Sequence, residues 1–425
     1  MKDKDKEKDT ASPLWTRDFT IITLGSVVSM LGGTLSGFAM SLLVLDYTGS
    51  PFYFALYNIA YFLPSIVMPI LSGPFLDRFS RKKTIYTLDF ITAGLYVIFA
   101  IVIKAGILNF PLLALGVFIL GTIGSVYQVA YESFYPLLIS KGNYSKAYSV
   151  ASTLETLTMV MVPVSTFIYK SLGIVAIFEI NVVTYLIAAI FETRIKQKED
   201  YIQLRQDMDE ASGFKSKGVK RFAADFKEGI GYLKSEKGLL AVTAYFFFSF
   251  FASGAGNAMT LPYFREAFKD GEYIYMIVWG CGSVARALGG TFHYRHKLPT
   301  DKKFSIALFV YVSISLLGAV YLFLPVKLMI VCCILNGLLG VTSYNIRISA
   351  TQRYVPDEKK GRFNGVFSTI TMIGMLLGQF VSGLLSLVLP IRTIIVIFEL
   401  ICGVAAVVLI GGNSRAVSKV YNTQD

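Results

Sequence analysis

Apolar stretches of roughly 20 residues run through the chain, and their length constrains the fold more than any other feature. An α-helix rises about 1.5 Å per residue, so a stretch of this length crosses the roughly 30 Å hydrocarbon core of a bilayer. A membrane barrel would alternate polar and apolar residues. A soluble domain with 54% hydrophobic and only 16% charged residues would lack the polar surface to cover itself. The sequence therefore predicts an all-α membrane protein with twelve transmembrane helices, near residues 18–45, 52–76, 83–104, 110–138, 146–170, 172–193, 239–265, 272–294, 302–324, 326–351, 361–387 and 389–411.

A polar segment at 194–238 divides these stretches into two groups of six. Within it, Phe222, Phe226, Ile230 and Leu233 recur at helical spacing, which predicts a surface helix between two bundles. A solvated linker that acts only through its length is the open alternative. The expected organisation is a cytoplasmic tail, an N-terminal six-helix bundle, the linker, a C-terminal six-helix bundle and a second cytoplasmic tail, at 1–17, 18–193, 194–238, 239–411 and 412–425.

Basic residues indicate the orientation of the chain in the membrane. Of the 40 Lys and Arg residues, six fall in segments expected outside, two lie within spans, and the other 32 fall in segments expected inside. We therefore expect both termini in the cytoplasm, in a multi-pass protein of the inner or plasma membrane. The net charge of +12 follows from this topology, so nucleic-acid binding needs no place in the account. The mixed-charge segment Met1–Thr10 and the long first stretch do not resemble a cleavable signal peptide.

The residues that usually build catalytic or metal centres are scarce. The four cysteines, Cys281, Cys332, Cys333 and Cys402, lie inside predicted spans without paired metal-ligand spacing, which favours reduced packing residues. The two histidines, His293 and His296, share one short segment. No hydrolase or zinc constellation and no Walker-type phosphate loop can be assembled, so we expect no enzymatic activity, no ATP hydrolysis, no metal site and no cofactor.

The two halves of the chain are weakly similar to each other at an offset of 216 residues. At this offset Gly121 and Gly124 align with Gly337 and Gly340, and Gly73 aligns with Gly289. Six spans repeated in the same orientation predict two bundles related by a pseudo-two-fold axis along the membrane normal, with a solute site between them.

Between the second and third spans the sequence at 73–83 reads GPFLDRFSRKK. It resembles the signature loop of the major facilitator superfamily, with Gly73, Asp77, Arg78 and Arg81 at the matching positions and Ser80 where the family usually has Gly. The resemblance implies a latch that holds the cytoplasmic side of a transporter shut. The alternative is that these charges only obey the positive-inside rule.

Further segments are similar to the macrolide-efflux-like and siderophore-exporter-like branch of this superfamily, among them SMLGG at 29–33 and YTGSP at 47–51. That branch implies proton-coupled efflux. Two departures weaken the efflux interpretation, because Gly33 stands where the branch often has Asp, and the fifth span has Pro163 without the glycines of drug–proton antiporters.

Ionisable residues inside spans are functional candidates because placing them in the membrane costs free energy. Glu155 is the deepest carboxylate predicted in the N-terminal half, and we expect it to couple protons or to bind a cationic solute; a structural hydrogen bond is the alternative. Arg286 could neutralise Glu155 or bind an anionic solute, or its side chain could reach toward the inner interface. Glu132 and Arg347 lie at the cytoplasmic ends of corresponding spans and are expected to form an inner gate.

The remaining charges within or near spans are expected to be structural. Asp46, Glu179, Glu399 and Arg392 fall near outer ends, where water or headgroups can solvate them. Asp89 is expected either to support the latch through Lys82 or to be a plain interfacial charge. Aromatic residues could line a cavity for a bulky amphipathic or cationic solute, although packing is the commoner fate of such side chains; the candidates are Tyr57, Tyr61, Tyr127, Tyr131, Phe247, Phe251, Trp279 and Tyr344.

Taken together, these features predict a monomeric secondary active transporter that moves a small, amphipathic organic solute by alternating access. Proton-coupled efflux is the first interpretation. An uptake symporter, a uniporter and a non-transporting sensor on the same fold are the alternatives.

Overall fold

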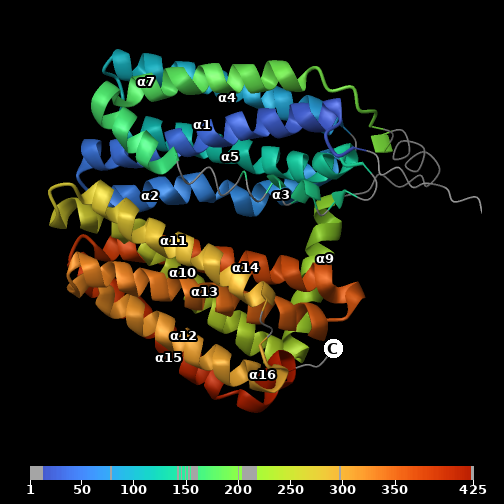
Figure 1. Ribbon diagram of the computed structural model, residues 1–425, viewed down its shortest axis with the longest axis vertical. Coiled ribbons are helices and arrows are strands. Elements are labelled where there is room, and N and C mark those ends of the chain that lie inside the picture. The colour runs from blue at the N-terminus through green and yellow to red at the C-terminus, as the bar shows by residue number, and fades with distance from the viewer. Residues whose placement is uncertain are drawn as a thin grey trace, which may run out of the picture. The chain divides into compact units, whose positions relative to one another are not determined.

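Long apolar helices make up nearly all of the structure (Figure 1). This computed structural model describes residues 13–76, 79–140, 143–144, 146–148, 150–151, 154, 161–199, 201–202, 218–295 and 298–422. Within these ranges, ten helices are long and apolar enough to cross a membrane: Arg17–Thr48, Pro51–Pro69, Arg81–Lys104, Phe110–Leu138, Met161–Glu192, Lys237–Ala267, Lys303–Phe323, Val326–Tyr354, Asp357–Leu385 and Ile391–Gly411.

Two predicted spans need separate comment. The stretch expected at 272–294 forms helix α11 (Gly271–Arg295), which is long but more polar than the ten. The stretch expected at 146–170 lies partly outside the described residues. Its C-terminal part continues into the next stretch as α7 (Met161–Glu192), with a break at Gly173, whose φ of 80° is a left-handed conformation that glycine adopts readily.

The chain forms two compact units, which we describe separately. The first consists of the described parts of Met1–Leu43 and Val67–Ser216. It contains most of α1 (Arg17–Thr48), most of α3 (Pro64–Leu76), α4 (Arg81–Lys104), α5 (Phe110–Phe134), the short helix Tyr135–Leu138 and α7. Helix α4 packs along α7 and α5, with the rings of Tyr96 and Phe99 against Phe178. This interface forms part of the unit's apolar core.

The second unit consists of Val44–Ile66 and the described part of Lys217–Asp425. It contains α2 (Pro51–Phe62), α9 (Gly218–Ser235), α10 (Lys237–Ala267), α11, α12 (Lys303–Val320), α13 (Val326–Tyr354), α14 (Asp357–Leu385), α15 (Ile391–Ala405), a π-helical turn (Ala406–Gly411) and α16 (Ser414–Tyr421). Its closest helix pairs are α10 with α14 and α11 with α13, and α2 packs on α14.

Glycines set the spacing of these helix pairs. A Cβ at Gly254 of α10 would lie 2.1 Å from the carbonyl oxygen of Met375 on α14, and a Cβ at Gly378 of α14 would lie 2.0 Å from the carbonyl oxygen of Phe251. The backbones therefore approach as closely as small residues allow, which is the usual packing of helices in membranes.

Helix α9 is the amphipathic helix at the C-terminal end of the polar segment. Leu233 is buried, and Phe226 and Ile230 pack against the core of the second unit. On its polar side Glu228 accepts a hydrogen bond of 2.5 Å from Arg362 of α14. Within this unit, α9 is therefore an integral part of the packing.

Candidate transport cavity

The second unit contains a cavity of about 510 Å³, and α10, α11, α12, α13 and α15 line it. Its walls combine aromatic rings, small residues and hydroxyls with three charged side chains, Arg286, Arg347 and Glu399. A cavity of this size that offers apolar walls and a few polar groups suits a small organic ligand.

Arg347 lies in an aromatic surround. Its guanidinium carbon is 4.6 Å from the ring centre of Phe367, 5.3 Å from that of Phe246 and 5.6 Å from that of Tyr344. In the described part of the chain no carboxylate forms an ion pair with it. The rings stabilise the cation through their negative faces and leave its charge available to an anionic group in the cavity.

Arg286 reaches the cavity from α11, and glycines hold its helix against α13. A Cβ at Gly337 would lie 2.2 Å from the carbonyl oxygen of Gly282, so the two backbones are in contact there. At Gly340 a Cβ would be 4.0 Å from the guanidinium nitrogen Nη1 of Arg286, so the side chain lies over a position that has no side chain of its own. The close packing brings both arginines into the lining of one cavity.

Among the described residues, Glu399 of α15 is the acidic residue that lines the cavity. Gly318 of α12 makes room for it, because a Cβ there would lie 2.7 Å from the carboxyl group. The sequence predicted that Glu399 would be solvated near an outer end, and this is wrong. Glu399 lies in the middle of α15, and its side chain lines the cavity.

The predicted aromatic residues are divided between the cavity and the packing. Trp279 and Tyr344 line the cavity. Phe247 and Phe251 pack elsewhere, with Phe251 stacked on Phe398 at 4.6 Å and Phe246 and Phe250 taking the lining positions on α10. In α2, Tyr57 is buried and Tyr61 is exposed. In α5, Tyr127 and Tyr131 stack on each other at 6.2 Å.

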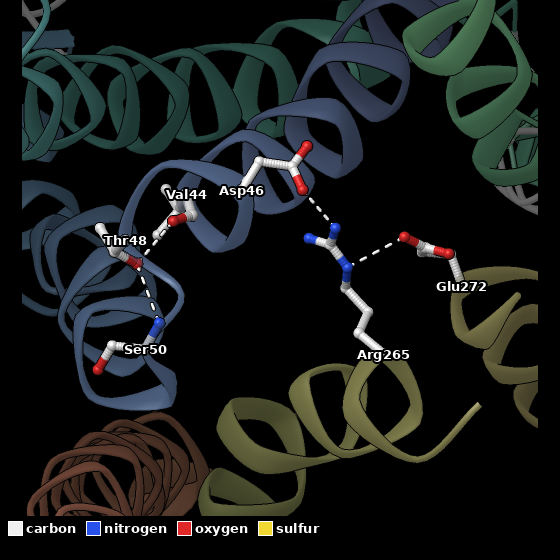
Figure 2. Close-up of polar contacts among 6 residues, drawn as sticks. All are labelled: Val44, Asp46, Thr48, Ser50, Arg265 and Glu272. Carbon is white, nitrogen blue, oxygen red and sulfur yellow. Dashed lines mark hydrogen bonds and ion pairs between the residues drawn. The ribbon is translucent and has the colours of Figure 1, made fainter. Parts of the chain in front are cut away.

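At one end of the second unit, a three-residue charge network joins the last turns of α1 to α10 and α11 (Figure 2). Arg265 of α10 pairs with Asp46 of α1 and, at 3.0 Å, with Glu272 of α11. Asp46 was expected to be a solvated charge near an outer end, so the sequence did not indicate this pairing.

Comparison with known proteins identifies the family. The Major Facilitator Superfamily profile matches residues 22–326, well over half of the chain. The chain belongs to the major facilitator superfamily. As the sequence predicted, it is a multi-pass membrane protein of a superfamily of transporters.

Among curated relatives, it is similar to the uncharacterized MFS-type transporter YkuC of Bacillus subtilis (strain 168), at 27% identity over 282 residues. The match spans 65% of this chain and 64% of that relative.

Solved superfamily structures share the fold at low identity. A structure described as a bacterial metal transporter matches with a TM-score of 0.69 at 13% identity, over 95% of this chain and 100% of that one. A bacterial homologue of the iron transporter ferroportin, in its inward-facing state, gives 0.66 at 15% over 93% and 98%. The nucleoside transporter NupG, as a point mutant, gives 0.63 at 12% over 93% and 98%. These likenesses concern the fold alone.

The superfamily's signature loop is held by a segment that follows α7. Glu199 accepts hydrogen bonds from the backbone nitrogen of Arg81 at 2.8 Å, from that of Lys82 at 3.3 Å and from the hydroxyl of Ser80. A carboxylate at the N-terminus of α4 accepts hydrogen bonds from backbone N–H groups that have no partner within the helix. The positive end of the helix dipole also stabilises its negative charge. Ser80 is also the N-cap, since its hydroxyl accepts from the Lys83 nitrogen at 3.0 Å.

The Arg81 side chain also bonds within this unit. Its guanidinium donates to the Ser133 carbonyl at 2.9 Å and lies 4.0 Å from the ring centre of Tyr201. Burial raises the pKa of the Tyr201 hydroxyl, which donates to Glu199 at 2.8 Å. Gly73 lies in α3 with open space beside it, and Asp77 and Arg78 lie outside the described residues.

Two further predicted charges have different outcomes. Glu132 is exposed and accepts a hydrogen bond of 2.6 Å from Gln128 one turn earlier on α5. Glu155 lies outside the described residues.

Asp89 departs from both sequence-based expectations. It is 2% exposed and accepts a hydrogen bond of 3.0 Å from Ser29, while Lys82 donates to the Ile195 carbonyl instead. Sequence reasoning passed over Glu192, at the end of the span predicted at 172–193, and Glu199, in the polar segment that follows. The available signal was a carboxylate at the margin of a span.

Proposed function

We propose that the chain is a secondary active transporter that moves a small amphipathic organic solute by alternating access. The cavity of the second unit carries this proposal, because aromatic and charged side chains meet in one space of about 510 Å³. An apolar solute body would lie against the rings, and its polar end would reach the charged side chains.

The charges favour a solute that bears an anionic group. Two arginines and one carboxylate line the cavity, and neither arginine has an acidic partner among the described residues. A planar guanidinium binds carboxylate or phosphate oxygens in pairs. Glu399 would take a cationic group, so a zwitterion also fits.

The remaining architecture belongs to the same proposal. Twelve spans would form two six-helix bundles, at 18–193 and 239–411, that are related by a pseudo-two-fold axis and joined by the linker at 194–238. Both termini would lie in the cytoplasm and a monomer in the lipid bilayer would suffice. Glu132 and Arg347 would meet as an inner gate when the cytoplasmic side closes, and Asp77, Arg78 and Arg81 would act as the latch.

Efflux by exchange with protons is the proposed direction and coupling. The similarity to efflux-type members of the superfamily and the absence of a Walker-type sequence support it. Glu155 stays a candidate for coupling, or for a cationic solute group, with Arg286 as its partner.

The test is solute accumulation in inverted membrane vesicles that carry the protein, with and without a proton gradient. Two probes separate the charge classes: a fluorescent aryl sulfonate and a fluorescent rhodamine cation. We expect gradient-dependent accumulation of the sulfonate, reduced at least tenfold in Arg347→Gln, since a lost charged contact of about 1.4 kcal/mol or more is at least a factor of ten.

Arg362→Gln is the matched control, because Arg362 pairs with Glu228 away from the cavity. It should transport like the wild type. Accumulation of the cation alone, unaffected by Arg347→Gln, would contradict the anionic solute. Uptake that ignores the gradient for both probes would contradict proton-coupled efflux.

A further inference from the structure

Two carboxyl groups are buried next to each other in the first unit. Asp89 of α4 is 2% exposed and Glu192 at the end of α7 is 0% exposed, and the two side chains interact directly. Gly25 of α1 leaves room for the Glu192 carboxylate, because a Cβ at this position would lie 2.9 Å from the Oε1 atom of Glu192. The pair therefore sits where α1, α4 and α7 meet.

Among the described residues, the surroundings offer the pair hydroxyl groups and no cationic partner. From α1, Ser29 donates to Asp89 at 3.0 Å. From α5, Tyr127 and Tyr131 are the titratable groups that face the pair, and the buried Tyr127 hydroxyl has no hydrogen-bond partner among the described residues. No Lys, Arg or His in the part of the chain that the structure describes forms an ion pair with either carboxyl.

The oxygens of Glu192 are the second observation that points to a ligand. Both are buried, and neither has a hydrogen-bond partner within the described residues. A fully buried carboxylate with no donor is among the least favourable groups in a protein interior. Two adjacent negative charges without a counter-ion would add mutual repulsion.

We propose that Asp89 and Glu192 form a proton-binding site, in which one proton is shared between the two carboxyl groups at neutral pH. Binding of the proton turns one carboxylate into a hydroxyl donor for the other, so the pair carries one negative charge instead of two and gains the missing hydrogen bond. Carboxyl pairs in other proteins share protons for this reason.

A proton fits this site better than a metal ion. Metal ions of the size of Mg²⁺ or Ca²⁺ take about six or more oxygen ligands. No group of three or more acidic, Cys or His side chains that could hold a metal occurs in the described residues. The two carboxyl groups and nearby hydroxyls supply too few ligands for such an ion, but enough for a proton.

The position of the pair links proton binding to the signature loop. Asp89 lies about two turns into α4 from Arg81. Glu192 is the last residue of α7, and the non-helical segment that follows it carries Glu199, which caps the same end of α4. Loss of the proton would place a second charge between α4 and α7, and this would push apart the helices that carry the latch contacts. This consequence rests on the proposed function, whereas the bound proton does not.

Infrared spectroscopy of the purified protein in lipid tests the site without any solute. A protonated carboxyl group absorbs infrared light at a different frequency from a carboxylate, and its band shifts in D₂O. We expect this band at neutral pH in the wild type and its loss in Asp89→Asn/Glu192→Gln, whose amides keep the shapes of the side chains. The matched control is Glu179→Gln, which changes an exposed carboxylate of α7 that pairs with Lys104, and this variant should keep the band.

Thermal unfolding against pH gives an independent measurement. A proton held by the folded pair and released on unfolding makes the protein less stable as pH rises through the point where the folded pair loses it. The wild type should show this alkaline loss, and the double variant should not.

Identical infrared spectra for the wild type and the double variant would overturn the proposal. So would stabilisation of the wild type, but not of the double variant, by added Na⁺ or Mg²⁺ with no protonated band. Proton-independent transport in the vesicle assay together with an intact band would reject the coupling and leave the proton site standing.

Discussion

Arg265 holds two carboxylates that come from different helices, and each has a different exposure. The Asp46 side chain is 40% exposed, whereas that of Glu272 is 9% exposed. Water and salt therefore screen the Arg265–Asp46 pair strongly and the Arg265–Glu272 pair only weakly. The free energy of the network should depend mainly on the contact with Glu272.

Replacing Arg265 by Gln should destabilise the protein by about 1 kcal/mol or somewhat more, because it leaves a nearly buried carboxylate without its cation. Asp46→Asn should cost less than half of this. Thermal unfolding in detergent at low and high salt measures both. Lys269→Gln removes an exposed positive charge close by in the chain and is the control. Equal losses for Asp46→Asn and Arg265→Gln would contradict the ranking.

Residue types were readable from the sequence, but their partners were not. Arg286 and Arg347 could be singled out because a charge in an apolar stretch is conspicuous. The rings around Arg347 and the position of Glu399 in the cavity depend on which face of each helix points inward. An apolar stretch carries little information about its inward face, because lipid and protein interior are both apolar. Aromatic residues are common on all faces of these membrane helices, so the sequence does not distinguish rings that line the cavity from rings that pack between helices.

Helix pairs in the second unit are spaced by backbone contact at glycine, and α10 illustrates how specific this is. Gly254 has no room for a side chain, since its Cβ would lie 2.1 Å from the Met375 carbonyl oxygen of α14. Gly256, on another face of the same helix, has no atom within 4 Å of its Cβ position. The same substitution should thus have opposite effects two residues apart.

Gly254→Ala should lower the free energy of unfolding by about 1–3 kcal/mol, because backbone cannot yield as a flexible side chain does. Gly256→Ala should be neutral or slightly stabilising, because Ala favours the helix. Thermal unfolding of both variants in one detergent makes the comparison. A loss at Gly256 as large as that at Gly254 would show that helix propensity or detergent, and not the contact with α14, decides the result.

Elements were more predictable than sites. Length and hydropathy predicted the ten described helices that are long and apolar enough to cross a membrane, since the hydrocarbon thickness dictates both properties. The break at Gly173 fell at the expected boundary between two stretches. The division of the second stretch into α2 and α3 was not predicted, although Pro64 at the start of α3 gives a physical reason. The cap that Glu199 provides for α4 joins segments more than 100 residues apart, and no local pattern reports it.

For the whole molecule, the distribution of basic residues makes the most direct prediction. Only six Lys and Arg residues fall in the segments expected outside, among them Lys269, which follows α10. Arg415 lies in α16 after the last span and should face the cytoplasm. The positive-inside rule reflects the preference for keeping basic loops on the cytoplasmic side during insertion.

Single cysteines at these two positions, in a variant whose four native cysteines are replaced by serine, report the orientation. A membrane-impermeant maleimide should label Lys269→Cys in intact cells and Arg415→Cys only in inverted vesicles. Both positions are exposed in the structure, so a failure to react would not come from burial. The reverse pattern would place both termini outside. Accumulation in inverted vesicles would still report efflux, because the interior of such a vesicle corresponds to the outside of the cell whichever way the chain is inserted.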